Sequence, residues 1–230
     1  MARRFSEEGS SVALTYHSHE QAALDVWQTL AEDDGRHSPP IRMDLENPES
    51  VRGAVRDAIR ELGGIDVLVN CAFRWGVYCD RVEDAAEEEW PAHLRANLES
   101  IFVLLQEASP YLRSSGTGRV VLISSPLAVT GTIGSWVYAT AKSAGHGLAR
   151  SLAWDLGRQG VLVNTVMPGT VIVDGAHRSI PTAELETLKK EQPSGCLPTA
   201  DEVADAVVFL GSPRTRAITG TVLPVTGGTP

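Results

Sequence analysis

The sequence predicts an α/β fold in one domain, residues 1–230, with helices on both faces of a parallel sheet. Two observations lead to this prediction. Strand-length apolar runs alternate along the chain with longer segments of helical periodicity, which is the pattern of strand–helix–strand units. A chain of 230 residues with 43% hydrophobic and 21% charged residues can bury one sizeable core, and no repeat or linker divides it.

The elements are predicted in chain order. The apolar runs indicate strands near Ser11–Tyr16, Ile41–Asp44, Asp66–Cys71, Arg119–Ser124, Leu162–Val166 and Thr221–Val225. The helical patterns indicate helices near Glu20–Glu32, Pro48–Leu62, Trp90–Ala108, Tyr138–Arg158, Thr182–Lys190 and Ala200–Leu210. Pro91 suits a first helical turn, and Thr199 with Glu202 has the spacing of a capping box. Gly160 is the predicted end of the helix that begins at Tyr138.

Composition excludes several classes of function. The net charge of −9 leaves no basic excess to neutralise phosphates, so nucleic acid is not a predicted partner. The longest apolar runs are strand-sized, so no membrane span or secretory signal is predicted. Cys71, Cys79 and Cys196 are scattered and odd in number, which favours a reducing cytoplasm over a disulfide framework. His17 and His19 are interpreted as a polar loop, and no metal site is predicted.

One constellation carries chemistry. Tyr138 and Lys142 are four residues apart and share one face of a helix, and Ser125 precedes the tyrosine by thirteen residues. A phenol titrates near pH ~10, and a neighbouring ammonium group lowers that pKa. Tyr138 is therefore a candidate general acid for ketone reduction or base for alcohol oxidation, and Ser125 a candidate donor to the same substrate oxygen. The bland alternative for the Tyr138–Lys142 spacing is a solvated helix face.

The surroundings of this constellation resemble the short-chain dehydrogenase/reductase family, especially its beta-ketoacyl-carrier-protein reductase-like members. The run Arg119–Ile123 ends in Ser124-Ser125, and Tyr138 and Lys142 follow at the family's spacing. Val163–Gly169 resembles the strand and Pro-Gly turn after the catalytic helix. Further matches are Asn70-Cys71-Ala72-Phe73 where the family has Asn-Asn-Ala-Gly, Asn97, Asp44, and the tail from Ile218 to Gly228. The resemblance implies a Rossmann-like, doubly wound sheet and runs from about Ala2 to Gly228.

The resemblance also implies roles. It makes Tyr138 the proton donor, Lys142 the group that lowers its pKa and holds a ribose, Ser125 the orienting hydroxyl, and Asn97 the support of a proton relay. The implied cofactor-binding residues are Asp44, Asn70, Ala72, Tyr138, Lys142, Pro168, Gly169 and Val171. For Asn97 the alternative is a surface residue of a helix, and for Asp44 it is a cap or turn. No acid at the end of the strand in Thr15–His19 is placed to bind a ribose 2′-hydroxyl, so NADP is favoured over NAD, although Glu20 lies close.

Three departures from the family pattern stand against these implications. The family's first strand and glycine-rich turn are missing, because Ala2–Gly9 resembles the second half of the helix that follows that turn. A start inside a longer protein, a true loss of the cofactor site, and a partner or rearranged segment are the open explanations. Phe73 replaces a glycine and is expected to crowd the ribose, to turn outward with Trp75, or to pack in the core. Val173 stands where the family often has a threonine.

Two functions follow. The first is an NADP-dependent oxidoreductase that acts on a carbonyl or alcohol small molecule. The alternative is a cofactor-free relative acting as a lyase, an isomerase or a non-catalytic subunit. Residues from Gly175 to Pro198 are expected to form a substrate lid or an ordinary surface loop. By resemblance a homodimer or homotetramer is expected through the long helices, with Trp136, Leu148 and Trp154 as interface or core residues.

Overall fold

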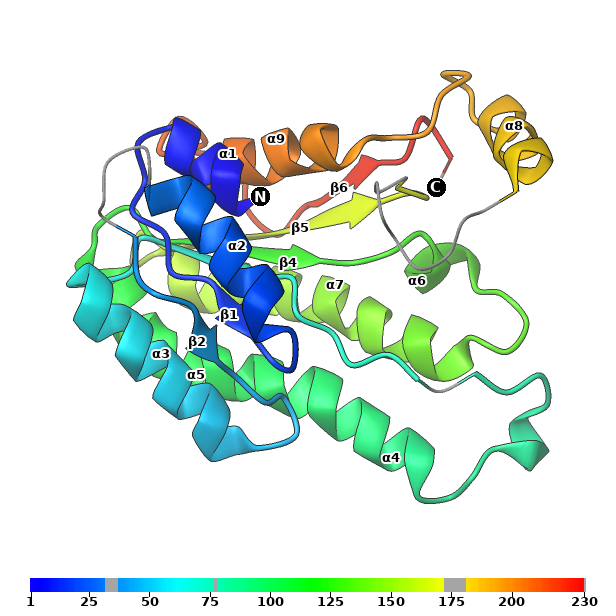
Figure 1. Cartoon of the computed structure of the whole chain (residues 1–230), viewed down its shortest axis with the longest axis horizontal. Helices are drawn as coiled ribbons and strands as arrows, with labels where there is room; N and C mark the ends of the chain where they lie inside the picture. The colour runs from blue at the N-terminus through cyan, green and yellow to red at the C-terminus, as the bar shows by residue number, and fades with distance from the viewer. Residues whose placement is uncertain (32–36, 77, 172–180, 230) are drawn as a thin grey trace.

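The structure is a computed structural model that describes residues 1–31, 37–76, 78–171 and 181–229. Parallel strands form its centre and helices cover both faces, as predicted (Figure 1). The strands are β1 (Thr15–Tyr16), β2 (Ile41–Arg42), β3 (Val67–Asn70), β4 (Arg119–Ile123), β5 (Leu162–Pro168) and β6 (Val222–Val225). The α-helices are α1 (Ala2–Glu7), α2 (Glu20–Ala31), α3 (Pro48–Leu62), α4 (Glu89–Leu94), α5 (Ser100–Ser114), α6 (Leu127–Thr130), α7 (Trp136–Gly157), α8 (Thr182–Glu191) and α9 (Ala200–Gly211).

The sheet is divided in two, which differs from the single sheet that the sequence suggests. Strands β1 and β2 form one parallel pair, and β3, β4, β5 and β6 form a separate parallel sheet in that order. Within the described residues no strand joins β1 to β3. The division lies where the family's first strand is missing from the predicted order, so the backbone edges of β1 and β3 are not paired with each other.

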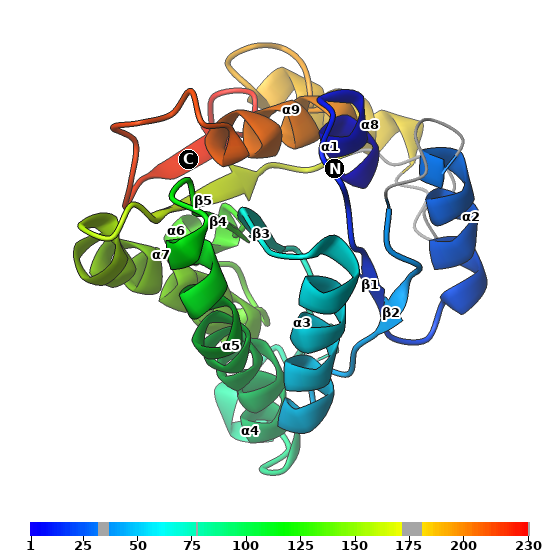
Figure 2. The same ribbon diagram turned by 90° about the vertical axis from the view of Figure 1, so that its left-hand side faces the viewer.

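Two apolar clusters hold the layers together. On one face of the larger sheet, buried residues of α3, α5 and α7 pack against β4 and β5; they include Val51, Val55, Leu104, Leu112, Ala149 and Val163. On the other face, α9 packs Val203, Val207 and Leu210 against the strands, and Met1 and Phe5 of α1 join this cluster. Figure 2 shows α1 and α9 on the side of the sheet opposite α3 and α5. The helix predicted within Ala2–Gly9 is therefore present as α1, and it covers one face of the sheet.

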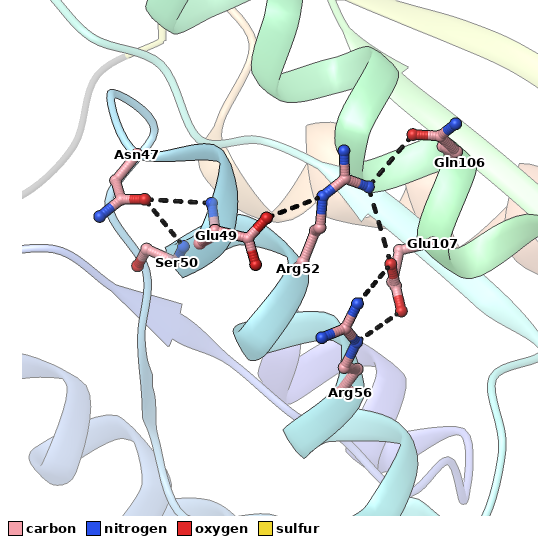
Figure 3. A network of polar contacts seen from close by, with 7 residues as sticks. All are labelled: Asn47, Glu49, Ser50, Arg52, Arg56, Gln106 and Glu107. Carbon is pink, nitrogen blue, oxygen red and sulfur yellow. Dashed lines mark hydrogen bonds and ion pairs between the residues drawn. The ribbon is translucent and has the colours of Figure 1, made fainter.

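Helix α3 is fixed at its start and along its length. The side chain of Asn47 accepts hydrogen bonds from the backbone N–H groups of Glu49 and Ser50, which caps the helix (Figure 3). Arg56 then donates two hydrogen bonds to Glu107 of α5, at 2.7 and 3.3 Å. The guanidinium holds the pKa of the Glu107 carboxyl below its usual range. These contacts set the position of α5, which carries the chain away from the site.

The long helix predicted at Trp90–Ala108 is not one uniform helix. Helix α4 ends at Leu94, a π-helical turn spans Arg95–Glu99, and α5 runs from Ser100 to Ser114 with Pro110 inside it. Helix α5 thus extends six residues beyond the predicted end at Ala108 and includes Pro110. A π-helical turn has no composition signal and is frequent at functional sites. Here it carries Asn97.

Candidate active site

The chain brings Ser125, Tyr138 and Lys142 together at the carboxyl end of β4. Ser125 follows the strand by two residues, and α7 carries Tyr138 and Lys142 one turn apart. The backbone N–H of Leu127 donates to the Ser125 hydroxyl oxygen at 3.3 Å. The Ser125 side chain is hydrogen-bonded to the Tyr138 phenol, so the two predicted oxygen-binding groups meet.

Lys142 is desolvated. Its ammonium group donates to the carbonyl oxygen of Ile123 at 2.9 Å and lies 4.2 Å from the centre of the Phe73 ring. Burial lowers the pKa of Lys142 from its usual value to about 8. The side chain is therefore about half neutral at pH ~8, where an exposed lysine is fully charged.

The predicted effect of the lysine on the tyrosine is wrong for the free protein. Burial raises the pKa of Tyr138, and the hydrogen bond from Ser125 offsets only part of that rise. The Lys142 nitrogen lies 5.9 Å from the Tyr138 ring centre and points to Ile123 and Phe73 instead. Burial of the phenol therefore sets the direction of the Tyr138 pKa shift in this structure.

An aromatic cluster surrounds these groups. The Phe73 ring lies edge-on to Tyr138 with centroids 5.1 Å apart, and edge-on to His93 at 5.3 Å. Trp75 stacks on the Tyr138 ring at 5.2 Å with planes 17° apart, although 72% of Trp75 is exposed. The Phe73 ring is half-buried beside the Lys142 ammonium group, and its crowding of a cofactor ribose stays a prediction. Trp75 alone turns toward solvent.

His93 is a site-adjacent residue that sequence reasoning missed. It is 1% exposed, and within the described residues neither ring nitrogen has a hydrogen-bond partner. Burial and the charge of Arg74 lower the pKa of His93. Burying an imidazole without a hydrogen-bond partner costs free energy. The edge-on contact with the Phe73 ring is the favourable interaction that His93 makes at this place. A lone histidine in a helical pattern gives no sequence signal for this.

Asn97 lies at the site, with its amide fully engaged. Its oxygen accepts from the Arg74 backbone N–H at 2.8 Å, and its nitrogen donates to the carbonyl groups of Arg74 and His93 at 3.0 Å each. Asn97 is 3% exposed, so the alternative of a surface residue is wrong. The side chain clamps the segment that carries Phe73 against the π-helical turn; a role in a proton relay stays a prediction.

A second polar pair missed by sequence reasoning lies behind the lysine. The Ser124 hydroxyl and the Nε2 atom of His146 are 2.6 Å apart, and both residues are buried. Ser124 also donates to the backbone carbonyl of Lys142 at 3.4 Å. The pair links the end of β4 to the middle of α7, so it fixes the strand that bears Ser125 relative to the helix that bears Tyr138. The Ser124-Ser125 dipeptide is visible in the sequence, but nothing in the sequence indicates that His146 is the partner of Ser124.

The predicted cofactor residues fall into three groups. Asn70 and Ala72 line one small cavity together with Phe73, Asn97, Lys142 and Thr165, whose buried hydroxyl has no partner within the described residues. Pro168 ends β5, and a Cβ on Gly169 would come within 3.0 Å of the Thr226 backbone, so glycine permits this close approach. Val171 packs against the α9 cluster.

Asp44 lies apart from the Lys142 cavity, in a turn. Its carboxylate accepts from the Glu46 backbone N–H at 2.9 Å, and its own N–H donates to the Ser50 hydroxyl. The turn interpretation of Asp44 is therefore correct, while an additional contact to a cofactor stays a prediction. Val173 and residues 175–180 of the expected lid lie outside the described residues, and α8 forms the part of that region that follows.

Comparison with known proteins gives this geometry a family. A family model described as Enoyl-(Acyl carrier protein) reductase matches residues 1–230. A 3-oxoacyl-[acyl-carrier-protein] reductase from Vibrio cholerae is 32% identical over 229 residues, covering 99% of this chain and 90% of its own length. A crystal structure of a short-chain dehydrogenase from Burkholderia cenocepacia in complex with NADP superposes with a TM-score of 0.88, 31% identity, and coverage of 99% and 91%. The chain belongs to the short-chain dehydrogenase/reductase family.

Relatives within the short-chain dehydrogenase/reductase family are named for different substrates. A probable galactose dehydrogenase from Rhizobium meliloti is 31% identical over 233 residues, covering 99% of this chain and 88% of its own length. A sugar and an acyl thioester are chemically unlike, so the relatives agree on oxidoreduction and disagree on what is oxidised or reduced. The family resemblance predicted from the motifs is confirmed.

Proposed function

We propose that the protein is an NADP(H)-dependent oxidoreductase that reduces a carbonyl group or oxidises a secondary alcohol. The observation that carries the proposal is the joint position of Ser125, Tyr138 and Lys142, with the serine bonded to the phenol and the lysine one helical turn away. This is an arrangement for binding one oxygen atom and moving one proton to or from it. A bound nicotinamide cofactor would supply the hydride.

The chain's own residues divide the proton chemistry. The Ser125 hydroxyl, which donates to the Tyr138 phenol in this structure, can turn its proton to a carbonyl oxygen and orient that oxygen beside the phenol. Tyr138 gives its proton to that oxygen during reduction and takes it back during oxidation. A cationic Lys142 stabilises the phenolate that reduction leaves behind, and this gain is largest when Phe73 no longer engages the ammonium.

The residues present fit a nicotinamide ribose in chemistry. The orphaned hydroxyl of Thr165 and the Lys142 ammonium face the same cavity, and sugar hydroxyls pair with both kinds of group. Asn70 and Ala72 would line that side, with Pro168 and Gly169 beyond. The cavity itself is small, about 20 Å³, and Phe73 is one of its lining residues. A ribose in this cavity therefore requires a lining side chain to move.

The preference for NADP over NAD rests on the end of β1. Glu20, the acid nearest to that strand, is hydrogen-bonded to the Tyr16 hydroxyl and raises its pKa. Arg42 at the end of the neighbouring strand donates to the backbone carbonyl of His17 at 3.4 Å. An engaged acid and an adjacent guanidinium suit a 2′-phosphate better than a free 2′-hydroxyl.

The test is NADPH consumption with a simple 3-oxoacyl thioester, acetoacetyl-N-acetylcysteamine, and, in the oxidative direction, NADPH formation from NADP⁺ with galactose. Tyr138→Phe removes the proton and is expected to lower kcat by at least about a hundredfold. Tyr111→Phe is the matched control, because Tyr111 lies on α5 and is 40% exposed. Equal rates for the Tyr138→Phe variant and the natural protein would reject Tyr138 as the acid.

A second candidate is favoured by a specific observation. The contact between Phe73 and Lys142 fills the side of the site that a cofactor would use, which suits a cofactor-free lyase, isomerase or non-catalytic subunit. NADPH titration separates the two functions. Absence of binding at millimolar NADPH, together with a folded protein by circular dichroism, would favour the cofactor-free role.

Self-association and cytoplasmic location complete the proposal. Trp154 of α7 is 79% exposed, and Phe102 of α5 is 58% exposed, as expected of helices that pair with a second copy. Leu148 packs against the core, and Trp136 is half-buried, so these two serve the fold. Cys71, Cys79 and Cys196 are free thiols, which suits a reducing compartment. Among the described helices none is long and apolar enough to cross a bilayer.

A further inference from the structure

The Phe73 ring lies against the ammonium group of Lys142. Its face is 4.2 Å from the ammonium nitrogen, while the Ile123 carbonyl accepts from the same group at 2.9 Å. The ammonium is thus engaged by a carbonyl oxygen and by an aromatic face. A cation over an aromatic face is attracted by the ring's quadrupole, most strongly when it is desolvated, as Lys142 is here.

The backbone beneath the ring is fixed by hydrogen bonds, while the ring itself contacts three other rings and the Lys142 ammonium group. Asn97 clamps the residue after Phe73 through both backbone groups of Arg74. The phenyl group contacts Tyr138, His93 and Trp75 at centroid distances of 5.1, 5.3 and 5.7 Å. Movement of Phe73 is therefore a rotation of one side chain, which exchanges ring contacts and breaks no hydrogen bond of its own.

The space left beside the ring is too small for an organic ligand. The cavity that Lys142 shares with Asn70, Ala72 and Asn97 has a volume of about 20 Å³, which is room for about one water molecule. We propose that Phe73 is a cover on Lys142 that a nicotinamide cofactor must displace, and that the ring limits cofactor affinity. The cofactor part of this inference rests on the proposed function; the cover itself does not.

The expected change in NADPH affinity follows from the strength of the contact between Phe73 and Lys142, which must be broken. A protein whose binding-competent form is a fraction of the whole shows a dissociation constant raised by the inverse of that fraction. A desolvated cation–aromatic contact is strong enough to hold the open form to roughly a tenth of the population. Removal of the ring is therefore expected to tighten NADPH binding about tenfold.

The first measurement needs no cofactor. The chain has three lysines, Lys142, Lys189 and Lys190, so amine labelling by trinitrobenzenesulfonate can be resolved by peptide mass spectrometry. In the natural protein Lys142 is expected to react far more slowly than the exposed Lys190. Phe73→Ala is expected to raise the Lys142 rate about tenfold relative to Lys190, and Phe73→Leu to raise it less.

Phe209→Ala is the matched control, because it removes the same ring from an exposed place on α9. It is expected to leave the Lys142 rate unchanged. Equal labelling of Lys142 in Phe73→Ala and the natural protein would overturn the cover. If Phe73→Ala fails to fold by circular dichroism, Phe73→Leu keeps most of the volume without the aromatic face, and an unchanged Lys142 rate there overturns the cover equally.

The second measurement is NADPH titration of the same proteins by tryptophan fluorescence, which Trp75 reports because it stacks on Tyr138. About tenfold tighter binding by Phe73→Ala than by the natural protein or Phe209→Ala supports the inference. Equal affinities would overturn the role of Phe73 in binding. If Lys142 is labelled faster in Phe73→Ala but no variant binds NADPH, Phe73 is still the cover on Lys142. That result would reject both the displacement of Phe73 by NADPH and the proposed function.

Discussion

Substitution of Asn97 tests whether one buried amide supports the site. Asn97→Leu keeps the approximate size of the side chain and removes three hydrogen bonds, of 2.8, 3.0 and 3.0 Å, two of which satisfy the backbone of Arg74. Each such bond contributes about 1 kcal/mol net, and each buried group left unpaired adds to the loss, so the free energy of unfolding is expected to fall by about 3 kcal/mol. For a chain of this length that corresponds to a melting temperature lower by roughly 6–12 °C.

The control is Asn164→Leu. Asn164 is 1% exposed, and its amide donates to the carbonyl of Ile218 at 2.8 Å and accepts from the Thr221 N–H at 3.2 Å. Both variants are expected to lose stability in urea unfolding, whereas only Asn97→Leu should speed amine labelling of Lys142, since only Asn97 holds the segment of Phe73. A loss under about 0.5 kcal/mol for Asn97→Leu, or equal labelling in both variants, would refute the reasoning.

Three further outcomes are expected. Lys142→Met should raise stability near pH 7 by on the order of 2–3 kcal/mol, because the folded pKa of about 8 lies below the usual 10.5. That gain should shrink as pH rises from about 8 to 10.5, where the unfolded lysine also loses its proton; urea unfolding at several pH values measures it. His93→Leu should stabilise by about 1–3 kcal/mol in urea and weaken acid destabilisation below pH ~6.5, because the pKa of the buried ring is lowered. Thr199→Ala should lower the melting temperature by the loss of about 1 kcal/mol of helix capping, and no change would contradict the capping box.

The predictable parts of the fold are those with local signals. Helix α3 begins and ends where predicted, because Pro48 and the Asn47 cap mark its start and Gly63, at φ 77°, lies directly after its end. The Thr199 capping box also forms as predicted. Strand β4 ends at Ile123, one residue before the predicted end, because the Ser124 side chain turns to His146 of α7.

The parts that could not be predicted depend on contacts between distant segments. The π-helical turn at Asn97 forms where its amide meets Arg74, 23 residues away, and no residue pattern announces that meeting. The sign of the Tyr138 pKa shift depends on how much desolvation outweighs nearby charge, a balance that spacing along a helix does not contain. The substitution at Phe73 is visible in the sequence, whereas the contact of its ring with Lys142, 69 residues away, is visible only in the structure.

The proton-transfer part and the cofactor part of the site are held in place by different interactions. Ser125, Tyr138 and Lys142 are held by backbone and buried polar contacts, including the Ser124–His146 pair, so the proton-transfer geometry exists without any ligand. The cofactor side is held by ring contacts of Phe73, which are weak enough to exchange. Chemistry that needs only a proton can therefore proceed in the closed form. Hydride transfer requires the open form, so its rate at low NADPH should depend on Phe73 while the pH dependence of proton transfer should not.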